Sequence, residues 1–253
     1  MNVLVMSLCL VLVALAARVV DASDWIDYPN NGEATMTHYD LPKDYIASCG
    51  CVGGSTKYPT AALSQMAYGS SAAYGPACGR CFNLTLLNTY ASYPPFFPDE
   101  AKSIVVKITD KCPLTKDGWC SGTNDKTNHG GHQLNFDLAY PSDAIPDDFF
   151  PSNASYYGFT DFGVWNITYE VVTCKHNWAG FDDTSALGAV DYLGPGSVCC
   201  PVEHTGSSND TCPPCTDHNG IAPDTTVWGS ACTNTVSMPL ALVLLWFVVV
   251  LNH

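Results

Sequence analysis

Basic residues are scarce in this sequence. It has 10 Lys and Arg residues against 24 Asp and Glu residues, which gives a formal net charge of −14 at pH 7. Binding to a nucleic-acid backbone depends on clustered positive charge, so this composition excludes a nucleic-acid surface. A neutral substrate or a weakly acidic medium fits the charge balance better. No internal repeat is apparent, and roughly two hundred residues between the two ends are enough for one domain with a sizeable core.

Long apolar runs are absent from the interior and occur only at the ends of the chain. Residues 1–22 have an apolar core followed by small residues, with Val20 and Ala22 at the spacing that signal peptidase prefers. No lysine stands near the start, yet the segment fits a secretory signal peptide best. We therefore expect a secreted, extracellular protein.

The C-terminal apolar run, Met238–Leu251, lacks two features of a membrane span. It is shorter than the ~20 apolar residues that a spanning helix needs, and no basic residue flanks it. The small residues Gly229, Ser230 and Ala231 precede it after a short polar spacer, as in a GPI-attachment signal. We expect residues 231–253 to be removed and a lipid anchor to be the protein's only membrane contact, with a short membrane anchor as the alternative.

Cysteines are abundant, and their number fits an oxidising compartment. Thirteen are present, and twelve remain once Cys9 leaves with the signal peptide. Pairs with CxxC spacing would indicate zinc or redox chemistry in the cytosol, but in a secreted protein structural disulfides are favoured. His129 and His132 flank two glycines and indicate a mobile loop rather than a metal site, so we expect no metal and no cofactor. Four glycosylation sequons agree with secretion, at Asn83, Asn153, Asn166 and Asn209.

The strand-like runs are short and separated by turns, which predicts an all-β barrel with long loops. One helix is expected over Thr60–Tyr68, with Thr60 as its N-cap. We expect residues 23–175 to form the barrel and residues 176–230 to form a Cys-rich tail. Seven mature cysteines precede that boundary and five follow it, so complete pairing requires a disulfide that clamps the tail to the barrel. The predicted strands are Phe82–Leu87, Ser103–Thr109, Leu134–Leu138 and Val164–Cys174, the last of which alternates around a core Trp165.

The stretch LNFDLAYP places one carboxylate, Asp137, between the apolar residues Phe136 and Leu138. Successive side chains of a strand point to opposite faces, so Asp137 points away from the apolar side. The aspartate is then either a solvated or capping residue, or a catalytic acid whose pKa is raised by desolvation.

Several motifs occur in a fixed order: ATMTHYD, SCGC, CGRCFNLT, IVVKITDKCP, NFDL and YEVVTC. Together they resemble the family 45 glycoside hydrolases, over about residues 34–174. The resemblance implies a six-stranded double-psi β-barrel with disulfide-braced loops, the fold shared with expansins and barwin-like proteins. It also implies an inverting endo-β-1,4-glucanase that acts on β-glucan, and we expect it to work as a monomer.

The resemblance also implies roles for individual residues. Asp137 in NFDL matches the family's general acid, and Asp40, which follows Tyr39, matches its catalytic base. His38 stands where the family has a tyrosine two residues before the base, and His38 and Tyr39 are expected to contact substrate. Inverting glycosidases need such a pair of carboxyl groups, roughly 6.5–9.5 Å apart. Some family members use a residue in the loop before WC instead, which makes Asp117 the alternative base.

Further substrate contacts are expected at Asp110 and Trp119. Asp110 in ITDKCP matches a third acidic position near the cleft, or else forms a turn before Pro113. Trp119 and Tyr140 offer flat rings that suit sugar faces, or else pack in the loops.

Two other functions remain open. Expansins share the barrel and the FDL aspartate but lack the early base, so Asp40 distinguishes a hydrolase from a wall-loosening protein. A disulfide-braced surface protein that binds a glycan or another protein without catalysis is the third possibility.

Overall fold

The computed structural model describes residues 25–42, 45–51, 58–69, 75–115, 117–174 and 176–181. The predicted signal peptide, the GPI-attachment signal and nearly all of the Cys-rich tail lie outside these residues. The described residues form six strands and two short helices: β1 (Asn31–Tyr39), β2 (Thr60–Ser64), α2 (Gln65–Tyr68), β3 (Cys81–Thr89), β4 (Ser103–Cys112), β5 (Asn135–Ala139), α3 (Ala154–Tyr157) and β6 (Trp165–Val172).

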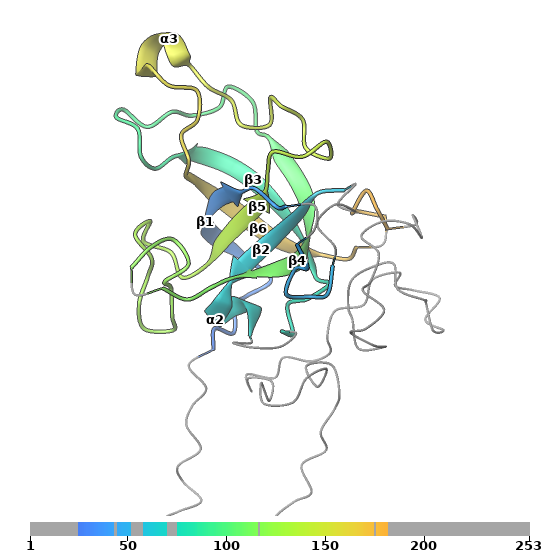
Figure 1. Cartoon of the computed structure of the whole chain (residues 1–253). Coiled ribbons are helices and arrows are strands. Elements are labelled where there is room, and N and C mark those ends of the chain that lie inside the picture. The colour runs from blue at the N-terminus through green and yellow to red at the C-terminus, as the bar shows by residue number, and fades with distance from the viewer. Residues whose placement is uncertain are drawn as a thin grey trace, which may run out of the picture.

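The six strands close into a barrel in the order β1-β5-β2-β4-β3-β6 (Figure 1). The pairs β1/β5 and β2/β4 are parallel, and the other neighbours are antiparallel. Most consecutive strands are not neighbours in this order: β5 lies between β1 and β2, and β4 lies between β2 and β3, so these connections cross over an end of the barrel. This is the predicted all-β fold, a six-stranded double-psi β-barrel.

Alternation along the strands sends one set of side chains into the barrel. In β6, Trp165, Ile167 and Tyr169 are all buried, which confirms Trp165 as a core residue. The rings of Phe82, Phe136 and Tyr169 meet inside, with centroids 5.1 to 6.2 Å apart. Such ring pairs add about 0.5–1.5 kcal/mol each beyond their burial. The core therefore holds β3, β5 and β6 in a fixed register.

The predicted helix over Thr60–Tyr68 is wrong in its first half. Residues 60–64 form β2, and only Gln65–Tyr68 is helical, ending at Gly69 with a φ of 86°. β2 is buried along its whole length, with β4 on one side and β5 on the other. Ala61 and Leu63 favour a helix in isolation, but strand pairing on both edges outweighs that propensity.

Disulfides brace the loops, as predicted. Three bridges lie within the described residues: Cys49–Cys78, Cys81–Cys174 and Cys112–Cys120. Cys51 is disulfide-bonded as well. In the part of the chain that the structure describes, no group of three metal-ligating side chains could hold a metal ion.

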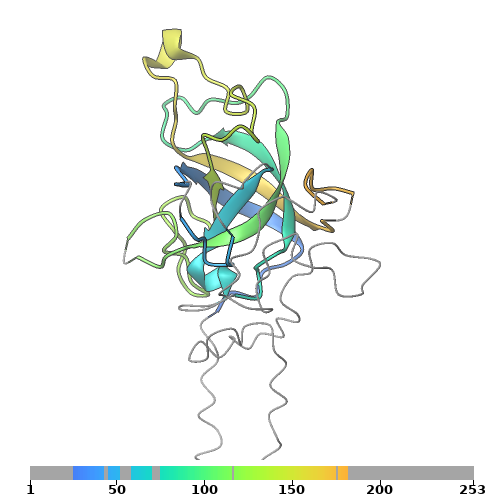
Figure 2. The same ribbon diagram turned by 45° about the vertical axis from the view of Figure 1, so that its right-hand side comes forward.

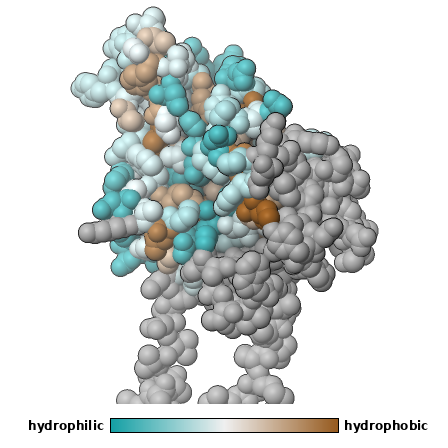
Figure 3. Space-filling view, in the orientation of Figure 1, coloured by the Kyte–Doolittle hydropathy of each residue, from teal (hydrophilic) through white to brown (hydrophobic). Residues whose placement is uncertain are grey.

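The end of the barrel that carries α3 is built from aromatic loops. The loop after β3 and the loop before β6 leave the barrel at this end (Figures 1 and 2). Phe96 from the first stacks on Phe162 from the second at a centroid distance of 5.4 Å. Hydrophobic residues show at this end in Figure 3. Phe97 of the first loop and Phe159 of the second are exposed. Across the described residues, no helix has both the length and the apolar character that crossing a bilayer requires.

Candidate active site

Asp137 lies at the centre of β5 and points out of the barrel. Its neighbours Phe136 and Leu138 are fully buried in the core, whereas Asp137 is half-buried. The predicted alternation is therefore observed, and the carboxyl group stands on the outer face of the sheet. A strand that is paired on both edges holds this position rigidly, because β1 and β2 flank β5.

Register places a second carboxylate on the same face. Thr37 of β1 pairs with Asp137, Asp137 pairs with Ala62 of β2, and Ala62 pairs with Asp110 of β4. Paired residues project to one side of a sheet, so these four side chains form a row across four strands. Adjacent strands lie ~4.8 Å apart, which puts the Cα atoms of Asp137 and Asp110 roughly 10 Å apart with only a methyl group between them.

The surroundings of Asp137 favour its protonated form. Burial raises the pKa of this carboxyl above its usual value, and the negative charge of Asp110 acts in the same direction. The hydroxyl of Thr37 donates to Oδ1 at 2.7 Å and, with the nearby His38, opposes the rise. Within the described residues Oδ2 makes no hydrogen bond, so this oxygen is the one that can carry a proton toward a ligand.

A chain of side-chain hydrogen bonds leads up to Asp137. The amide of Asn128 donates to Thr35 Oγ1 at 2.7 Å, and Thr35 Oγ1 donates to Asn135 Oδ1 at 2.7 Å. Asn135 Nδ2 then donates to Thr37 Oγ1 at 2.9 Å, so the Thr37 hydroxyl is left to donate to Asp137. Each member has its donor and acceptor assigned, which fixes the rotamer of Thr37. The sequence pattern did not identify this chain, because its bonds join strands about one hundred residues apart.

Asp110 is held in a different way. It is 3% exposed, and its Oδ1 accepts backbone N–H groups from Ser48 and Lys111, both at 2.8 Å. Its Oδ2 accepts the hydroxyl of Tyr39 at 3.2 Å. Burial and the negative charge of Asp110 raise the pKa of Tyr39 far above its ordinary value, so the phenol stays a donor. Asp110 is thus a fixed acceptor beside Asp137 rather than a turn residue alone.

His38 borders this group without joining the row. Its Nε2 lies 3.1 Å from Oδ2 of Asp161. Its ring packs against Tyr140 and Phe150, with both centroids 5.5 Å away. Tyr140 therefore packs in the loops, which was the alternative to a contact with a sugar ring. The His38 ring is also close enough to act electrostatically on Asp137.

The two candidate bases lie outside the row. Asp40 follows the last residue of β1 and is exposed, and Asp117 is exposed in the loop before Trp119. The Asp117 backbone carbonyl accepts a hydrogen bond from Thr115. Trp119 packs edge-on against Tyr90, with centroids 5.1 Å apart. The structure thus brings Asp137, Tyr39 and Asp110 together with His38 at their edge, and neither Asp40 nor Asp117 hydrogen-bonds to Asp137 within the described residues.

A family profile described as EXPB1-like domain 1 matches residues 34–180, which contain all six strands of the barrel except the first residues of β1. The chain belongs to the EXPB1-like domain 1 family. The row of Asp137 and Asp110 therefore lies on the outer face of an EXPB1-like domain. No curated protein sequence matches the chain.

Solved structures similar to this EXPB1-like domain include two family 45 endoglucanases and an expansin. Endoglucanase EG27II, in complex with cellobiose, is 21% identical, with 61% of this chain and 87% of that chain covered and a TM-score of 0.40. Endoglucanase Cel45A from the blue mussel Mytilus edulis is 26% identical, with coverages of 59% and 83% and a TM-score of 0.40. The expansin of Clavibacter michiganensis is 17% identical, with coverages of 56% and 50% and a TM-score of 0.31.

Proposed function

We propose that this protein is an inverting endo-β-1,4-glucanase in which Asp137 is the general acid. The observation that carries the proposal is the setting of Asp137, a carboxyl group with a raised pKa, one oxygen fixed by Thr37 and the other free. A general acid must hold its proton near the working pH, and desolvation beside another carboxylate is the usual way to achieve this. The motif resemblance to family 45 glycoside hydrolases supports the choice of β-1,4-glucan as substrate.

The proposed reaction needs two carboxyl groups with different roles. Asp137 donates its proton to the glycosidic oxygen as the bond from that oxygen to C1 breaks, and a water molecule attacks C1 from the opposite face. Asp110 is unsuited to activate this water, because it is buried and three donors already occupy its oxygens. Exposed carboxylates remain, and we propose Asp40 as the base, with Asp117 as the alternative.

A non-hydrolytic, expansin-like activity is the second candidate. The match to the EXPB1-like domain favours it, and so does the position of Asp40 outside the Asp137 row. In this case the same face would bind β-glucan without cutting it, and the raised pKa of Asp137 would serve hydrogen bonding to a sugar hydroxyl. Asp40 and Asp117 would then have no catalytic role.

Release of reducing ends from soluble β-1,4-glucans tests the proposal. The purified protein is compared with its Asp137→Asn, Asp40→Asn and Asp117→Asn variants, each checked for folding. Asp99→Asn, a change at an exposed acidic residue of the loop after β3, is the matched control. Removal of a general acid or base costs typically about 10²–10⁴-fold in rate.

The outcomes separate the candidates. Loss of activity in Asp137→Asn and Asp40→Asn, with Asp117→Asn and the control active, supports the proposed pair. Loss in Asp117→Asn instead of Asp40→Asn assigns the base to Asp117. No cutting by a well-folded parent that still binds insoluble β-glucan would reject hydrolysis in favour of the expansin-like activity.

We further propose that the protein is secreted and held at the cell surface by a GPI anchor. The N-terminal signal pattern, the disulfides and the C-terminal small-residue triplet support this address. Mass spectrometry of the mature protein should find residues 1–22 absent and a lipid-linked residue near Ser230. An intact apolar C-terminus would reject the anchor.

A further inference from the structure

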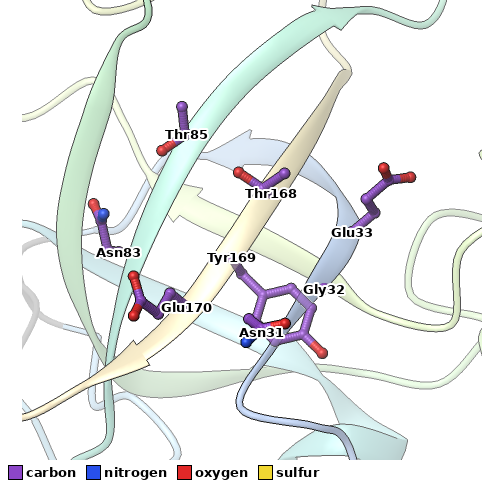
Figure 4. A pocket seen from close by; sticks show the side chains of 8 residues that line it. All are labelled: Asn31, Gly32, Glu33, Asn83, Thr85, Thr168, Tyr169 and Glu170. Atoms are coloured by element: carbon purple, nitrogen blue, oxygen red, sulfur yellow. The ribbon is translucent and has the colours of Figure 1, made fainter.

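A polar groove lies on a different side of the barrel from Asp137. It has a volume of about 500 Å³, within the ~300–1,000 Å³ range of ligand sites. Strands β1, β6 and β3 form its floor, whereas Asp137 lies on β5, between β1 and β2 (Figure 4). The groove is lined by Asn31, Gly32, Glu33, Asn83, Thr85, Thr168, Tyr169 and Glu170.

Two rows of outward side chains build this groove. Glu170 of β6 pairs with Asn31 of β1 on one side and with Asn83 of β3 on the other. The next row has Thr168 of β6 in the same central position. Figure 4 shows Asn83 and Glu170 side by side on neighbouring strands. The groove therefore offers amide, hydroxyl and carboxylate groups, which suit the hydroxyl groups of a sugar.

Asn83 begins one of the glycosylation sequons, Asn83-Leu84-Thr85, and both its polar residues line the groove. The side chain of Asn83 makes no hydrogen bond within the described residues. Its amide nitrogen is thus available for a covalent bond without any loss to the fold. Thr85 Oγ1 lies 2.7 Å from Oγ of Ser103 in β4. β4 pairs with the edge of β3 that faces away from β6.

The sequon at Asn166 is in the opposite situation. Asn166 Nδ2 donates to Asn88 Oδ1 at 2.8 Å, and Asn166 Oδ1 is buried. A glycan leaves that nitrogen one N–H, and the trans preference of a secondary amide places the sugar on the same side as Oδ1, which is buried, so the side chain would have to move outward. A chain modified at Asn166 would therefore fail to close the pairing of β3 with β6.

We propose that Asn83 carries an N-linked glycan whose first sugars lie in the groove over β1, β6 and β3, and that Asn166 is unmodified in the folded protein. The donor is an oligosaccharide linked to a lipid pyrophosphate. The bond from Asn83 Nδ2 to the sugar C1 forms as the bond from C1 to the pyrophosphate oxygen breaks, the lipid pyrophosphate leaves with the electron pair, and the amide gives up one proton. This inference rests on passage through the secretory pathway and is independent of the proposed hydrolysis.

The placement has a consequence for the candidate active site. In the closed barrel, β1 and β4 separate the pair β3 and β6 from the pair β5 and β2. A glycan seated on β6 and β3 covers an exposed polar sheet face that does not include Asp137 of β5. Glycosylation at Asn83 is therefore compatible with binding of a long glucan chain.

Site occupancy is measured by glycopeptide mass spectrometry on the full chain secreted from a eukaryotic host. We expect glycan at Asn83 and none at Asn166. Thr85→Ala should remove the modification at Asn83 and Thr85→Ser should retain it, since the hydroxyl is what the sequon requires. A secreted protein with Asn83 unmodified, or with Asn166 occupied, would overturn the assignment, and so would retention of the chain in the cytosol.

The position of the glycan in the groove is tested separately, with a peptide-N-glycosidase acting on the folded protein. Asn153 provides the internal control, because it is the exposed N-cap residue of α3 and is not among the residues that line this groove. We expect release from Asn83 to be at least several-fold slower than release from Asn153, and the two rates to become equal after denaturation. Equal rates on the folded protein would refute the placement in the groove.

Discussion

Replacement of Thr37 by Val tests how the fold controls Asp137. The Thr37 hydroxyl donates to Asp137 Oδ1 at 2.7 Å, and this bond lowers the pKa of a carboxyl that burial raises. A hydrogen bond to a charged group contributes about 1.5–3 kcal/mol, and it favours only the ionised form here. Thr37→Val should therefore increase the proton affinity of Asp137 by about 10- to 100-fold, since 1.4 kcal/mol is a factor of about ten.

The shift is read most directly from the Asp137 carboxyl resonance in an NMR pH titration. Hydrolysis, if it depends on protonated Asp137, should persist to higher pH in Thr37→Val than in the parent, because activity is lost as the pH rises through this pKa. Thr37→Ser keeps the hydroxyl and serves as the control. Val also removes one of the two acceptors of Asn135 Nδ2 and leaves only Cys120 Sγ, at 3.4 Å, so some loss of stability is expected. An unchanged or lowered pKa of Asp137 in Thr37→Val would refute the reasoning.

Three further changes address the charges on and near this face. Asp137 has a folded-state pKa above its unfolded value, so its contribution to stability is complete below the unfolded pKa and is lost as the pH rises through the folded pKa. Asp137→Asn should therefore be more stable than the parent near pH 7 but not near pH 3, as measured by urea unfolding at about these values. Asp110→Asn removes a negative charge roughly 10 Å from Asp137. The repulsion between the two charges is about 0.4–1.7 kcal/mol for an effective dielectric constant between about 80 and 20, so the pKa of Asp137 should fall in the same NMR titration. Lys107 is fully buried, and its Nζ has no hydrogen-bond partner among the residues that the structure describes. Burial lowers its pKa well below the usual value, so Lys107→Met should be most stabilising at low pH and lose its advantage as the pH rises toward 10.5. Lower stability of Lys107→Met at every pH would contradict this account.

The strands were predictable wherever alternation is strong. The runs beginning at Ser103 and near Trp165 were expected as strands and are found as β4 and β6, which start at these residues. β2 was missed because its residues, Thr60–Ser64, are buried on both faces and so show no alternation. Local propensity favours a helix there, and the information that decides otherwise lies in β4 and β5. A single sequence window does not contain those partners.

The candidate site was predictable in its residues more than in its contacts. The alternation of side chains along β5 was enough to place Asp137 on the outer face, and the motifs pointed to Tyr39 and Asp110. The contact between Tyr39 and Asp110 joins β1 to β4, which are not neighbours in the sheet. Thr37 was missed because it has no distinguishing motif, and only the parallel register of β1 with β5 sets it beside Asp137. Nonlocal register is thus what the sequence pattern could not supply.

The different hydrogen bonding of the two carboxylates in the row gives them separate electrostatic roles. Asp110 accepts two backbone N–H groups and the Tyr39 hydroxyl, so both of its oxygens are already occupied by donors from the protein. Asp137 accepts one hydroxyl, and burial raises its pKa, which favours the protonated form of this carboxyl group. The intervening strand β2 presents only the methyl group of Ala62, and Asp110, which is itself buried, acts on Asp137 through its charge. A half-buried acid that keeps its proton on the outer face of a sheet suits a substrate that lies across strands, as an extended polysaccharide does.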